Sequence, residues 1–336
     1  MAIENILNSN MPIDVVVAWV NGEDPAHREK MRSYLNDSAK LSEAAKHPTR
    51  FNSVGEINYC IRSVFTFAPF VRNVFIVTDN QVPDIEGDIK KYFPERWQDL
   101  KIIDHRIIFE GYEQFLPTFN SISIASMLWR IPGLAEQFVY FNDDVILIRP
   151  VKPQDWFIQG NPVLRGQWAM PPRLRIAWDA IRTFYHRNIL SHIRYQPGPS
   201  FQIYQWQSAR MLGFRNRYFR HGHTPIPFNP AKTRDFFKSN PDKLAKNIAC
   251  RFREKEQFTI GSLANHLEIK AGNKNFKPMN TVYFQPYNRK NGYLNRKVRE
   301  CQDPSVQWIC VQSLDRCPSQ IRQELFDWLE SLLIPE

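Results

Sequence analysis

Residues 13–20 read Ile-Asp-Val-Val-Val-Ala-Trp-Val and constrain the fold more than any other stretch of the chain. β-Branched side chains dominate this run, which indicates a strand buried on both faces, as in a parallel sheet. Asn21 and Gly22 follow it and indicate a tight turn. Three further short apolar runs each predict another strand, at residues 74–77, 101–104 and 138–141.

Segments with helical features separate these runs. Asp24 is placed to cap a charged helix that starts at Pro25 and runs towards Ala45. Ser53 and Glu56 fit a capping box, and the apolar residues that follow fall on one helical face: Ile57, Cys60, Ile61, Val64 and Phe65. Strands that alternate with helices predict an α/β protein with a mostly parallel sheet, right-handed crossovers and helices on both faces.

Three divisions are expected along the chain. Residues 1–150 should form the α/β core, residues 151–215 a basic, aromatic helical insertion, and residues 216–336 the remainder of the catalytic domain with a C-terminal helix. Within the insertion, residues 177–193 are typical of a helix with a basic face. Residues 319–334 place their apolar side chains on one stripe, which predicts a helix that docks on the core rather than one that lies on a membrane.

The chain carries 44 Lys and Arg against 34 Asp and Glu, a net charge of +10, which implies an anionic partner. Much of the excess lies between residues 165 and 220, where arginines alternate with aromatic residues. Such a pattern suits a nucleic acid, a solvated helix surface or a trough for a polyanionic polymer. No RNA-binding motif, zinc knuckle or helix-turn-helix signature accompanies it, so nucleic acid is not expected as a partner.

The compartment is read from features that the sequence lacks. No apolar run reaches the length of about 18 residues that indicates a membrane span. Residues 1–11 lack the basic start and apolar centre of a signal peptide, so a cytoplasmic location is expected. The five cysteines are odd in number and lack the close pairs of a zinc site, which predicts reduced cysteines and no disulfide framework.

Two adjacent carboxylates, Asp143 and Asp144, follow the apolar run that ends at residue 141, with Asn142 before them. In open α/β sheets ligands bind beyond the carboxyl ends of the strands, and two carboxylates there suit a Mg²⁺ or Mn²⁺ that carries a substrate diphosphate. The alternative is an ordinary turn, because Asn and Asp are common turn formers. Residues 21–22 and 78–79 are expected at the same edge, so that three segments converge on one crevice.

Two later segments add groups suited to phosphoryl chemistry. Residues 221–227 hold His221 and His223 among a glycine and two prolines, and histidine suits proton transfer near neutral pH. Residues 251–257 begin Arg-Phe-Arg, and an arginine can clamp a phosphate with its planar fork. Each segment also has a structural interpretation, as a loop whose histidines merely hydrogen-bond and as an exposed helix start.

Taken together, these segments resemble the four conserved regions of the Stealth family of sugar-phosphate transferases. The family includes bacterial capsular polysaccharide hexosamine-1-phosphate transferases and the catalytic part of the lysosomal-enzyme N-acetylglucosamine-1-phosphotransferase. Residues 13–22 resemble the first region, residues 223–227 the third and residues 251–253 the fourth. The second region is similar to a series of segments, at residues 50–56, 62–63, 67–72, 74–79, 116–121 and 140–145.

The resemblance implies a Rossmann-like or GT-A-like sheet and a transferase that moves a whole hexosamine-1-phosphate. The donor would be a UDP-hexosamine and the acceptor a saccharide or a phosphodiester-linked polysaccharide, with release of UMP. A capsule-assembly complex at the inner membrane is the implied partner, which would make the protein peripheral there.

The resemblance also assigns roles to individual residues. Asp143 and Asp144 would hold the Mg²⁺ or Mn²⁺. His223 would act as general base or as a charged stabiliser, and Arg253 would bind phosphate, with Arg251 as the alternative. The remaining residues expected to bind substrate are Trp19, Asn21, Gly22, Arg62, Ser121 and Asn142.

The chain departs from the family pattern at two positions. Ala125 stands where the family usually has a glutamate that serves the acceptor side, and Gln257 stands where an acid is usual. Two other functions therefore remain open. A metal-dependent glycosyltransferase would transfer only the sugar and release UDP, and a polyanion-binding protein would use the two carboxylates for a structural metal.

Overall fold

A computed structural model describes residues 11–35, 51–188, 200–287 and 292–334. The first predicted helix is present as α2 (Pro25–Leu35), and its predicted course towards Ala45 lies outside the described residues. The predicted end of the insertion helix at residue 193 also lies outside them. No helix in the described ranges is both long enough and apolar enough to cross a membrane.

A five-stranded sheet forms the centre of the molecule, with the strand order β11-β4-β1-β2-β3. Strand β1 (Ile13–Ala18) runs parallel to both β2 (Val71–Thr78) and β4 (Gln137–Asn142). Strand β2 runs parallel to β3 (Leu100–Asp104), and the edge strand β11 (Ile226–Phe228) is antiparallel to β4. The predicted α/β fold with a mostly parallel sheet is confirmed.

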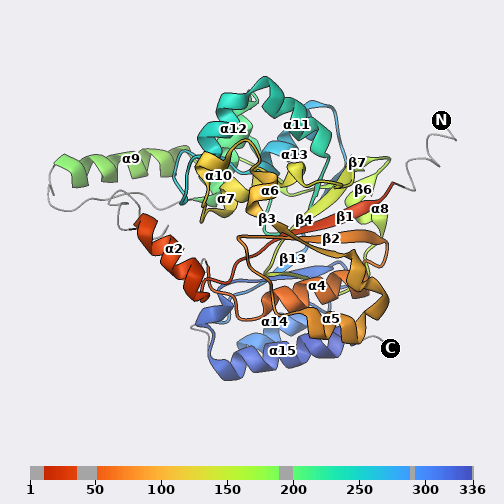
Figure 1. Ribbon diagram of the computed structural model, residues 1–336. Helices are drawn as coiled ribbons and strands as arrows, with labels where there is room; N and C mark the ends of the chain where they lie inside the picture. The colour runs from red at the N-terminus through yellow and green to blue at the C-terminus, as the bar shows by residue number, and fades with distance from the viewer. Residues whose placement is uncertain (1–10, 36–50, 189–199, 288–291, 335–336) are drawn as a thin grey trace.

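Helices cover both faces of this sheet, as predicted (Figure 1). On β1, Val15 and Val17 belong to one core cluster together with residues of α4 (Glu56–Phe67). Val16, between them, belongs to a second cluster together with residues of α13 (Ile260–Lys270). The alternation follows the two-residue period of a strand, so Val15, Val16 and Val17 all need apolar side chains.

A second sheet extends the fold on the far side of the acidic turn. Its strand order is β13-β14-β5, formed by β13 (Thr281–Phe284), β14 (Trp308–Val311) and β5 (Val145–Leu147). Because β4 ends at Asn142 and β5 begins at Val145, the turn Asp143-Asp144 joins the two sheets. A third cluster of buried apolar residues lies behind this sheet and includes Leu325, Leu329 and Leu333.

The remaining elements are short or lie towards the later part of the chain. The helices are α5 (Glu86–Tyr92), α6 (His105–Ile108), α7 (Ser121–Ala125), α8 (Pro153–Trp156), α9 (Arg173–Asn188), α10 (Phe201–Met211), α11 (Pro230–Ser239), α12 (Pro241–Ile248), α14 (Tyr293–Glu300) and α15 (Ser319–Leu333). Single turns of 3₁₀-helix occupy Glu113–Phe115, Leu128–Arg130 and Leu314–Arg316, and a longer one occupies Pro94–Asp99. Two-stranded ladders pair β6 (Phe157–Ile158) with β7 (Asn161–Pro162), β8 (Leu164–Arg165) with β12 (Phe276–Lys277), and β9 (Gln167–Ala169) with β10 (Tyr218–Arg220).

The predicted capping box at the start of α4 is wrong in its details. The cap is Gly55, which adopts a left-handed conformation (φ 102°) that favours glycine, and no side chain caps the helix. Ser53 lies two residues further out and donates to the Glu56 carboxylate at 3.4 Å, and the Val54 amide donates to the same oxygen at 2.7 Å. Glu56 thus holds the incoming loop instead of completing a cap.

The C-terminal helix α15 docks on the core as predicted, and Arg62 of α4 contributes to that docking. The Arg62 side chain is only 1% exposed and donates to the two carboxylate oxygens of Glu330 at 2.6 and 2.8 Å. Its guanidinium also lies over the ring of Tyr92, 4.5 Å from the centroid. The assignment of Arg62 to substrate binding is therefore corrected, because its donors are used between two helices, away from the strand ends.

Replacing Arg62 with alanine is expected to lower the free energy of unfolding by about 2 kcal/mol, because a buried side chain loses its packing and its charge-assisted hydrogen bonds to the half-exposed Glu330. Chemical denaturation of the variant would measure this loss. Arg299→Ala removes an exposed arginine of α14 and serves as the control, with little expected effect. Unchanged stability together with weaker substrate binding would restore the original assignment.

Candidate active site

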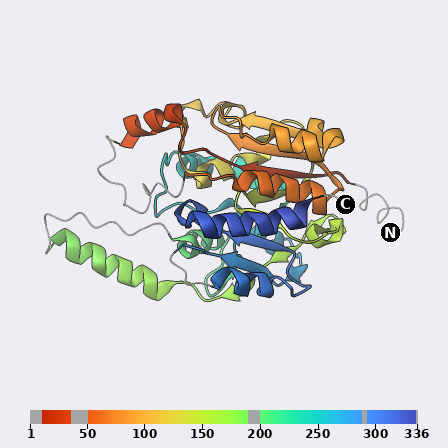
Figure 2. The same ribbon diagram turned by 90° about the horizontal axis from the view of Figure 1, so that it is seen from below.

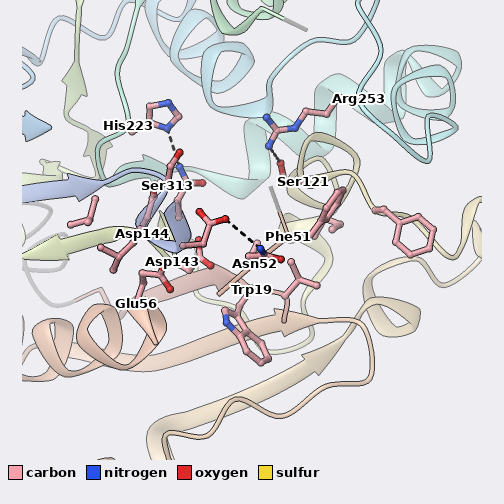
Figure 3. A pocket seen from close by; sticks show the side chains of 18 of the residues that line it. Trp19, Phe51, Asn52, Glu56, Ser121, Asp143, Asp144, His223, Arg253 and Ser313 are labelled. Carbon is pink, nitrogen blue, oxygen red and sulfur yellow. Dashed lines mark hydrogen bonds between the residues drawn. The ribbon is translucent and has the colours of Figure 1, made fainter. Parts of the chain in front are cut away.

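A cavity of about 230 Å³ lies at the carboxyl end of the parallel strands. β1 supplies Ala18 and the following Trp19, β4 supplies Tyr140 and Asn142, and the turn after β4 supplies Asp143 and Asp144 (Figure 3). Loops from distant parts of the sequence close the space, and they contribute Phe51, Asn52, Phe119, Ser121, His223, Arg253, Ser313 and Asp315 among other residues. The predicted convergence of strand ends on one crevice is present for β1 and β4.

Asp79, which follows β2, lies beside this cavity rather than in its lining. Lys30 of α2 donates to its carboxylate at 2.8 Å, and His27 Nδ1 lies 3.6 Å from the same oxygen. Burial favours the neutral carboxyl group, but the nearby His27 ring and the hydrogen bond from Lys30 outweigh it and lower the pKa of Asp79. Its carboxylate therefore anchors α2 against the sheet edge.

The acidic turn carries more negative charge than its surroundings neutralise. Burial, then Asp144 and then Glu56 raise the pKa of Asp143 well above its usual value. Burial also raises the pKa of Asp144 and of Glu56. Asp144 accepts one hydrogen bond, from the Cys310 thiol at 3.4 Å, whereas its buried Oδ1 has no hydrogen-bond partner among the described residues. A divalent cation bound by Asp143 and Asp144 would neutralise this charge and satisfy the free oxygen.

The donor set fits magnesium or manganese better than a metal held by protein alone. Within the described ranges, no three His, Cys, Asp or Glu side chains are placed to hold a metal ion together. Mg²⁺ usually keeps several waters and takes one or two protein carboxylates together with substrate phosphates. Asp143 and Asp144, which line the open cavity, satisfy that requirement.

His223 lies at the opposite wall of the cavity, held from three sides. Its backbone amide donates to the Tyr283 hydroxyl at 2.8 Å, and its ring stacks on Phe201 with centroids 4.9 Å apart. A Cβ on the preceding Gly222 would collide with that hydroxyl, so the close approach requires glycine. Burial, and next the nearby charge of Arg253, lower the pKa of His223 to about 4, which makes the imidazole neutral at pH 7.

Asn142 determines which nitrogen of this neutral ring carries the proton. Its Oδ1 accepts from the Tyr140 hydroxyl at 3.0 Å, so its Nδ2 is the atom that faces His223 Nδ1, at 3.2 Å. An amide nitrogen donates, and His223 Nδ1 must therefore accept. The proton of the neutral ring is then on Nε2, which acts as a hydrogen-bond donor.

Arg253 and Ser121 form the third wall. The guanidinium donates to Ser121 Oγ at 2.5 Å, and both residues line the cavity. Asn120, just before Ser121, donates through its side chain to the carbonyl oxygens of Cys250 and Phe252, which fixes the arginine segment beside α7. The juxtaposition joins parts of the chain 132 residues apart.

Arg251 does not reach the cavity. Its guanidinium donates to the Pro117 carbonyl at 2.6 Å and lies over the ring of Tyr34 at 4.7 Å. Gln257, where the family pattern has an acid, is also structural, since its side-chain amide donates to the Asn247 carbonyl at 2.7 Å and accepts from Asn120. The alternative assignment of phosphate binding to Arg251 is therefore corrected in favour of Arg253.

The turn after β1 contributes one lining residue and two supporting ones. Trp19 lines the cavity and donates through Nε1 to Ser53 at 3.2 Å. Asn21 and Gly22, both expected to bind substrate, instead shape the turn. The Asn21 backbone amide donates to Gln81 Oε1, and Gln81 Nε2 donates to the Asn21 carbonyl. The Gly22 amide donates to the Phe51 carbonyl at 2.6 Å. The predicted substrate contact of Asn21 and Gly22 is therefore corrected: the two residues support the turn and do not line the cavity.

Replacing Gly22 with alanine is expected to displace the loop that carries Phe51, because the new Cβ would lie 2.5 Å from Phe51 Cβ and 2.6 Å from its carbonyl oxygen. Such overpacking costs about 1–3 kcal/mol of stability. Activity should fall as well, since Phe51 and Asn52 line the cavity. Thermal denaturation and initial rates measure both effects, and Gly87→Ala, where no atom lies within 4 Å of the new Cβ, is the control. Equal behaviour of the two variants would contradict the packing argument.

A second cavity of about 240 Å³ adjoins the first. Ser121, Tyr140, Asn142, His223 and Arg253 line both. The far wall of the second cavity is mostly apolar and includes Ala125, Phe201, Tyr204, Ile226 and Ile260. A glutamate at position 125 would place a carboxylate in this wall, so the departure from the family pattern changes the second cavity and leaves the acidic turn untouched.

Three of the lining residues that the sequence interpretation missed show why it missed them. Glu56 was assigned to a helix cap, and its only signal was an acid within an otherwise apolar segment. Asp315, which accepts from Asn52 at 3.3 Å, and Phe201 give no local signal at all. Their roles depend on contacts between segments far apart in the sequence.

Two family models and several curated proteins are similar to parts of this chain. The family model for Stealth protein conserved region 1 (CR1) matches residues 11–39, and that for conserved region 2 (CR2) matches residues 50–163. The chain is 40% identical over 153 residues to a protein named capsular polysaccharide phosphotransferase fcs1 of Haemophilus influenzae, which covers 46% of this chain and 40% of that protein. It is 34% identical over 230 residues to capsular polysaccharide phosphotransferase cps1A of Actinobacillus pleuropneumoniae, covering 62% and 60%.

A solved structure with a similar arrangement is the galactosyltransferase LgtC in complex with donor and acceptor sugar analogues. It is 14% identical in sequence, covers 96% of this chain and 98% of its own, and gives a TM-score of 0.42. The fold described above rests on the strand pairing of this chain. The chain spans between 40% and 60% of the length of the two curated relatives named above.

The sheet and the site thus define an α/β protein with a candidate active site at the carboxyl ends of its parallel strands, where two aspartates face a histidine and an arginine. The chain carries conserved regions 1 and 2 of Stealth proteins, at residues 11–39 and 50–163. His223 and Arg253 lie outside the residues matched by these two regions.

Proposed function

We propose that the protein transfers hexosamine-1-phosphate from a UDP-hexosamine to a sugar hydroxyl in the synthesis of a capsular or other cell-surface polysaccharide. The observation that carries the proposal is the pair of adjoining cavities, which share Ser121, His223 and Arg253 at their junction. The names of the relatives, capsular polysaccharide phosphotransferases, support the same class of reaction. The donor sugar would most naturally be N-acetylated, as the family resemblance suggests.

The proposed reaction balances as a displacement at phosphorus. The acceptor oxygen forms a bond to the phosphorus that bears the sugar, and the bond from that phosphorus to the bridging oxygen breaks. The electron pair leaves with UMP, and the hydroxyl proton is released at neutral pH. The products are a phosphodiester and UMP, and the anomeric bond of the sugar is never broken. Such chemistry depends on positioning and on neutralisation of phosphoryl charge.

Each cavity suits one substrate. The first cavity combines the acidic turn with Trp19 and Phe51 and fits the nucleotide diphosphate side of a donor. Mg²⁺ or Mn²⁺ held by Asp143 and Asp144 would neutralise the diphosphate when bound. The second cavity, with its mostly apolar wall, fits the faces of a sugar acceptor. The transferred phosphoryl group would then lie at the shared residues between the two.

Arg253 and His223 are proposed to stabilise that phosphoryl group. Arg253 supplies a fixed positive charge whose orientation the Ser121 hydroxyl supports. His223, neutral and protonated on Nε2, would donate a hydrogen bond to a phosphoryl oxygen. In this tautomer the neutral ring can donate a hydrogen bond to the phosphoryl group, which favours that role over the role of general base.

A pair of substitutions separates the two roles of His223. Glutamine can place its side-chain N–H near the position of Nε2 but cannot accept a proton at neutral pH. His223→Gln is therefore expected to keep at least about tenfold more activity than His223→Ala, as fits the loss of a transition-state hydrogen bond. Initial rates at saturating donor measure the difference. Equal loss in both variants would favour the general base.

Two competing functions can be distinguished from the proposed one, the first by the partner that binds and the second by the nucleotide that is released. A nucleotide-sugar should raise the melting temperature in the presence of Mg²⁺ but not in EDTA, since a ligand stabilises the folded state in proportion to its affinity. A binding protein for anionic polymer would respond to the polymer instead, and less so at high salt. A glycosyltransferase would show the same nucleotide response as the proposed enzyme and would differ in releasing UDP.

The use of a nucleotide-sugar favours a cytoplasmic site of action, and the capsule-assembly partner at the inner membrane remains part of the proposal.

A further inference from the structure

Helix α9 (Arg173–Asn188) projects from the body of the molecule (Figures 1 and 2). Six large apolar or aromatic side chains on it are exposed. Four of them form an apolar stripe: Leu174 (89%), Trp178 (59%), Ile181 (59%) and Tyr185 (47%). Their spacing of four, three and four residues places them on one face of the helix. Met170, just before the helix, is 78% exposed.

This apolar stripe faces away from the protein. The side of α9 that faces α10 (Phe201–Met211) carries the other two exposed apolar side chains, Ile176 and Phe184, as well as Asp179 and Thr183, and these residues line a cavity of about 680 Å³ between the two helices. A helix that docks on a core has the opposite arrangement, as α15 does with Leu325, Leu329 and Leu333 buried. Nothing in the part of the chain that the structure describes covers the stripe.

The charge around the stripe indicates what kind of occupant would cover it. Between residues 160 and 230 the only acidic residue is Asp179, whereas ten arginines occur: Arg165, Arg173, Arg175, Arg182, Arg187, Arg194, Arg210, Arg215, Arg217 and Arg220. Arg175 and Arg182 are exposed and, at helical spacing, flank the apolar stripe on the same side. A helix with Leu, Ile, Trp and Tyr on one face and arginine beside them has the pattern of helices that lie in the interface of an anionic membrane.

We propose that α9 is an interfacial helix that inserts Leu174, Trp178, Ile181 and Tyr185 into the headgroup region of a membrane containing anionic lipid. A second copy of the chain is disfavoured as occupant, because two such helices would bring arginines against arginines. A free polyanion would pair with the arginines but would leave the apolar stripe in water. An anionic bilayer satisfies both features at once.

The placement of α9 gives the membrane contact a consequence for the site. α9 and α10 line a common cavity, and Phe201, the first residue of α10, stacks on His223 in the second cavity. A membrane-bound α9 would therefore hold the second cavity near the bilayer surface, where an acceptor attached to lipid would lie. That consequence rests on the proposed function, whereas the membrane contact itself does not.

Flotation of the full chain with vesicles tests the contact. Vesicles of phosphatidylcholine with about 25% phosphatidylglycerol would be compared with vesicles of pure phosphatidylcholine, because an anionic leaflet attracts basic segments. Binding to the anionic vesicles is expected, and Trp178→Ser with Ile181→Ser should weaken it by at least about tenfold, since two anchoring side chains are lost. Val82→Ser with Ile102→Ser, which changes two exposed apolar residues elsewhere (74% and 42%), is the matched control and should bind like the unaltered chain.

Two further measurements identify the source of binding. Arg175→Gln with Arg182→Gln should remove most of the preference for anionic over neutral vesicles. The fluorescence difference between the unaltered chain and Trp178→Phe should shift to the blue with vesicles and be quenched by brominated lipid. Transfer to a short soluble acceptor should be the same in all these variants, so that failure of the membrane contact does not imply failure of the proposed reaction.

Several outcomes would overturn the proposal. Equal flotation of the unaltered and doubly substituted chains would show that another surface binds. No flotation, combined with a dimer that the serine substitutions dissociate, would assign the stripe to a second copy. Binding to an anionic polymer that depends on the arginines, with no binding to vesicles, would assign the face to a polyanion.

Discussion

Replacing Asp144 with asparagine is expected to lower the rate of transfer by at least about 10³-fold, or about 4 kcal/mol of transition-state stabilisation. The substitution keeps the size of the side chain and removes one of the two charges that would hold the metal beside the donor diphosphate. The Oδ1 atom of Asp144 is buried and has no hydrogen-bond partner among the described residues, so it is the oxygen most available to a cation. Initial rates with saturating Mg²⁺ would measure the loss, and Asp143→Asn should behave similarly.

Stability provides the control, because its expected change has the opposite sign. Burial raises the pKa of Asp144 above its ordinary value, so the metal-free native state binds more protons than the unfolded chain. Its stability should then fall as pH rises from below the ordinary carboxyl range through the raised pKa. Asp144→Asn removes part of this cost, and its melting temperature in EDTA should equal or exceed that of the unaltered chain at pH 7. A variant that is inactive only because it is unfolded would contradict the metal assignment.

Replacing Arg253 with alanine is expected to lower kcat by about 10²- to 10³-fold, the range seen when one preorganised donor to a developing charge is lost. Arg253 lines both cavities and is oriented by Ser121, so its charge lies where the phosphoryl group would be transferred. Arg253→Lys should recover only part of the rate, since a lysine lacks the planar fork. Steady-state kinetics of the two variants measure the effect.

Arg251→Lys is the matched control for Arg253. Arg251 donates to backbone carbonyls of the loop before α7, so its substitution should affect stability more than kcat.

A second readout of the Arg253 substitution is the pKa of His223, which burial and then Arg253 lower to about 4. Arg253→Ala should raise that pKa, which NMR titration of the imidazole can follow. A normal kcat in Arg253→Ala, with a large loss in Arg251→Lys, would reverse the two assignments.

The parts of the fold that the sequence predicted are those set by local pattern. The β-branched run in β1 and the apolar run before Asn142 specify buried parallel strands, and a parallel sheet brings its carboxyl ends to one edge. That is why the acidic turn and the turn after Trp19 could be placed together before any coordinates were known. The C-terminal helix was predictable for the same reason, since its apolar stripe is periodic.

The parts that could not be predicted depend on partners distant in sequence. β5 has only three residues and pairs with β14 from the other end of the chain, so no local signal announces the second sheet. Arg62 was assigned to substrate because its sequence context resembles the family, but Glu330, 268 residues away, takes its donors. Gly22 was expected to touch substrate and instead permits the approach of Phe51. Residue type and motif order identified the site, and packing decided which motif residues face it.

The nucleotide released on turnover tests the proposed function most directly. Purified protein would be incubated with Mg²⁺, a panel of UDP-hexosamines and capsular oligosaccharide acceptors, with Asp144→Asn as the control. Release of UMP with one proton, matched by formation of a phosphodiester and absent in the variant, is the predicted result. Release of UDP would instead mean that only the sugar is transferred, and would contradict sugar-phosphate transfer at this site.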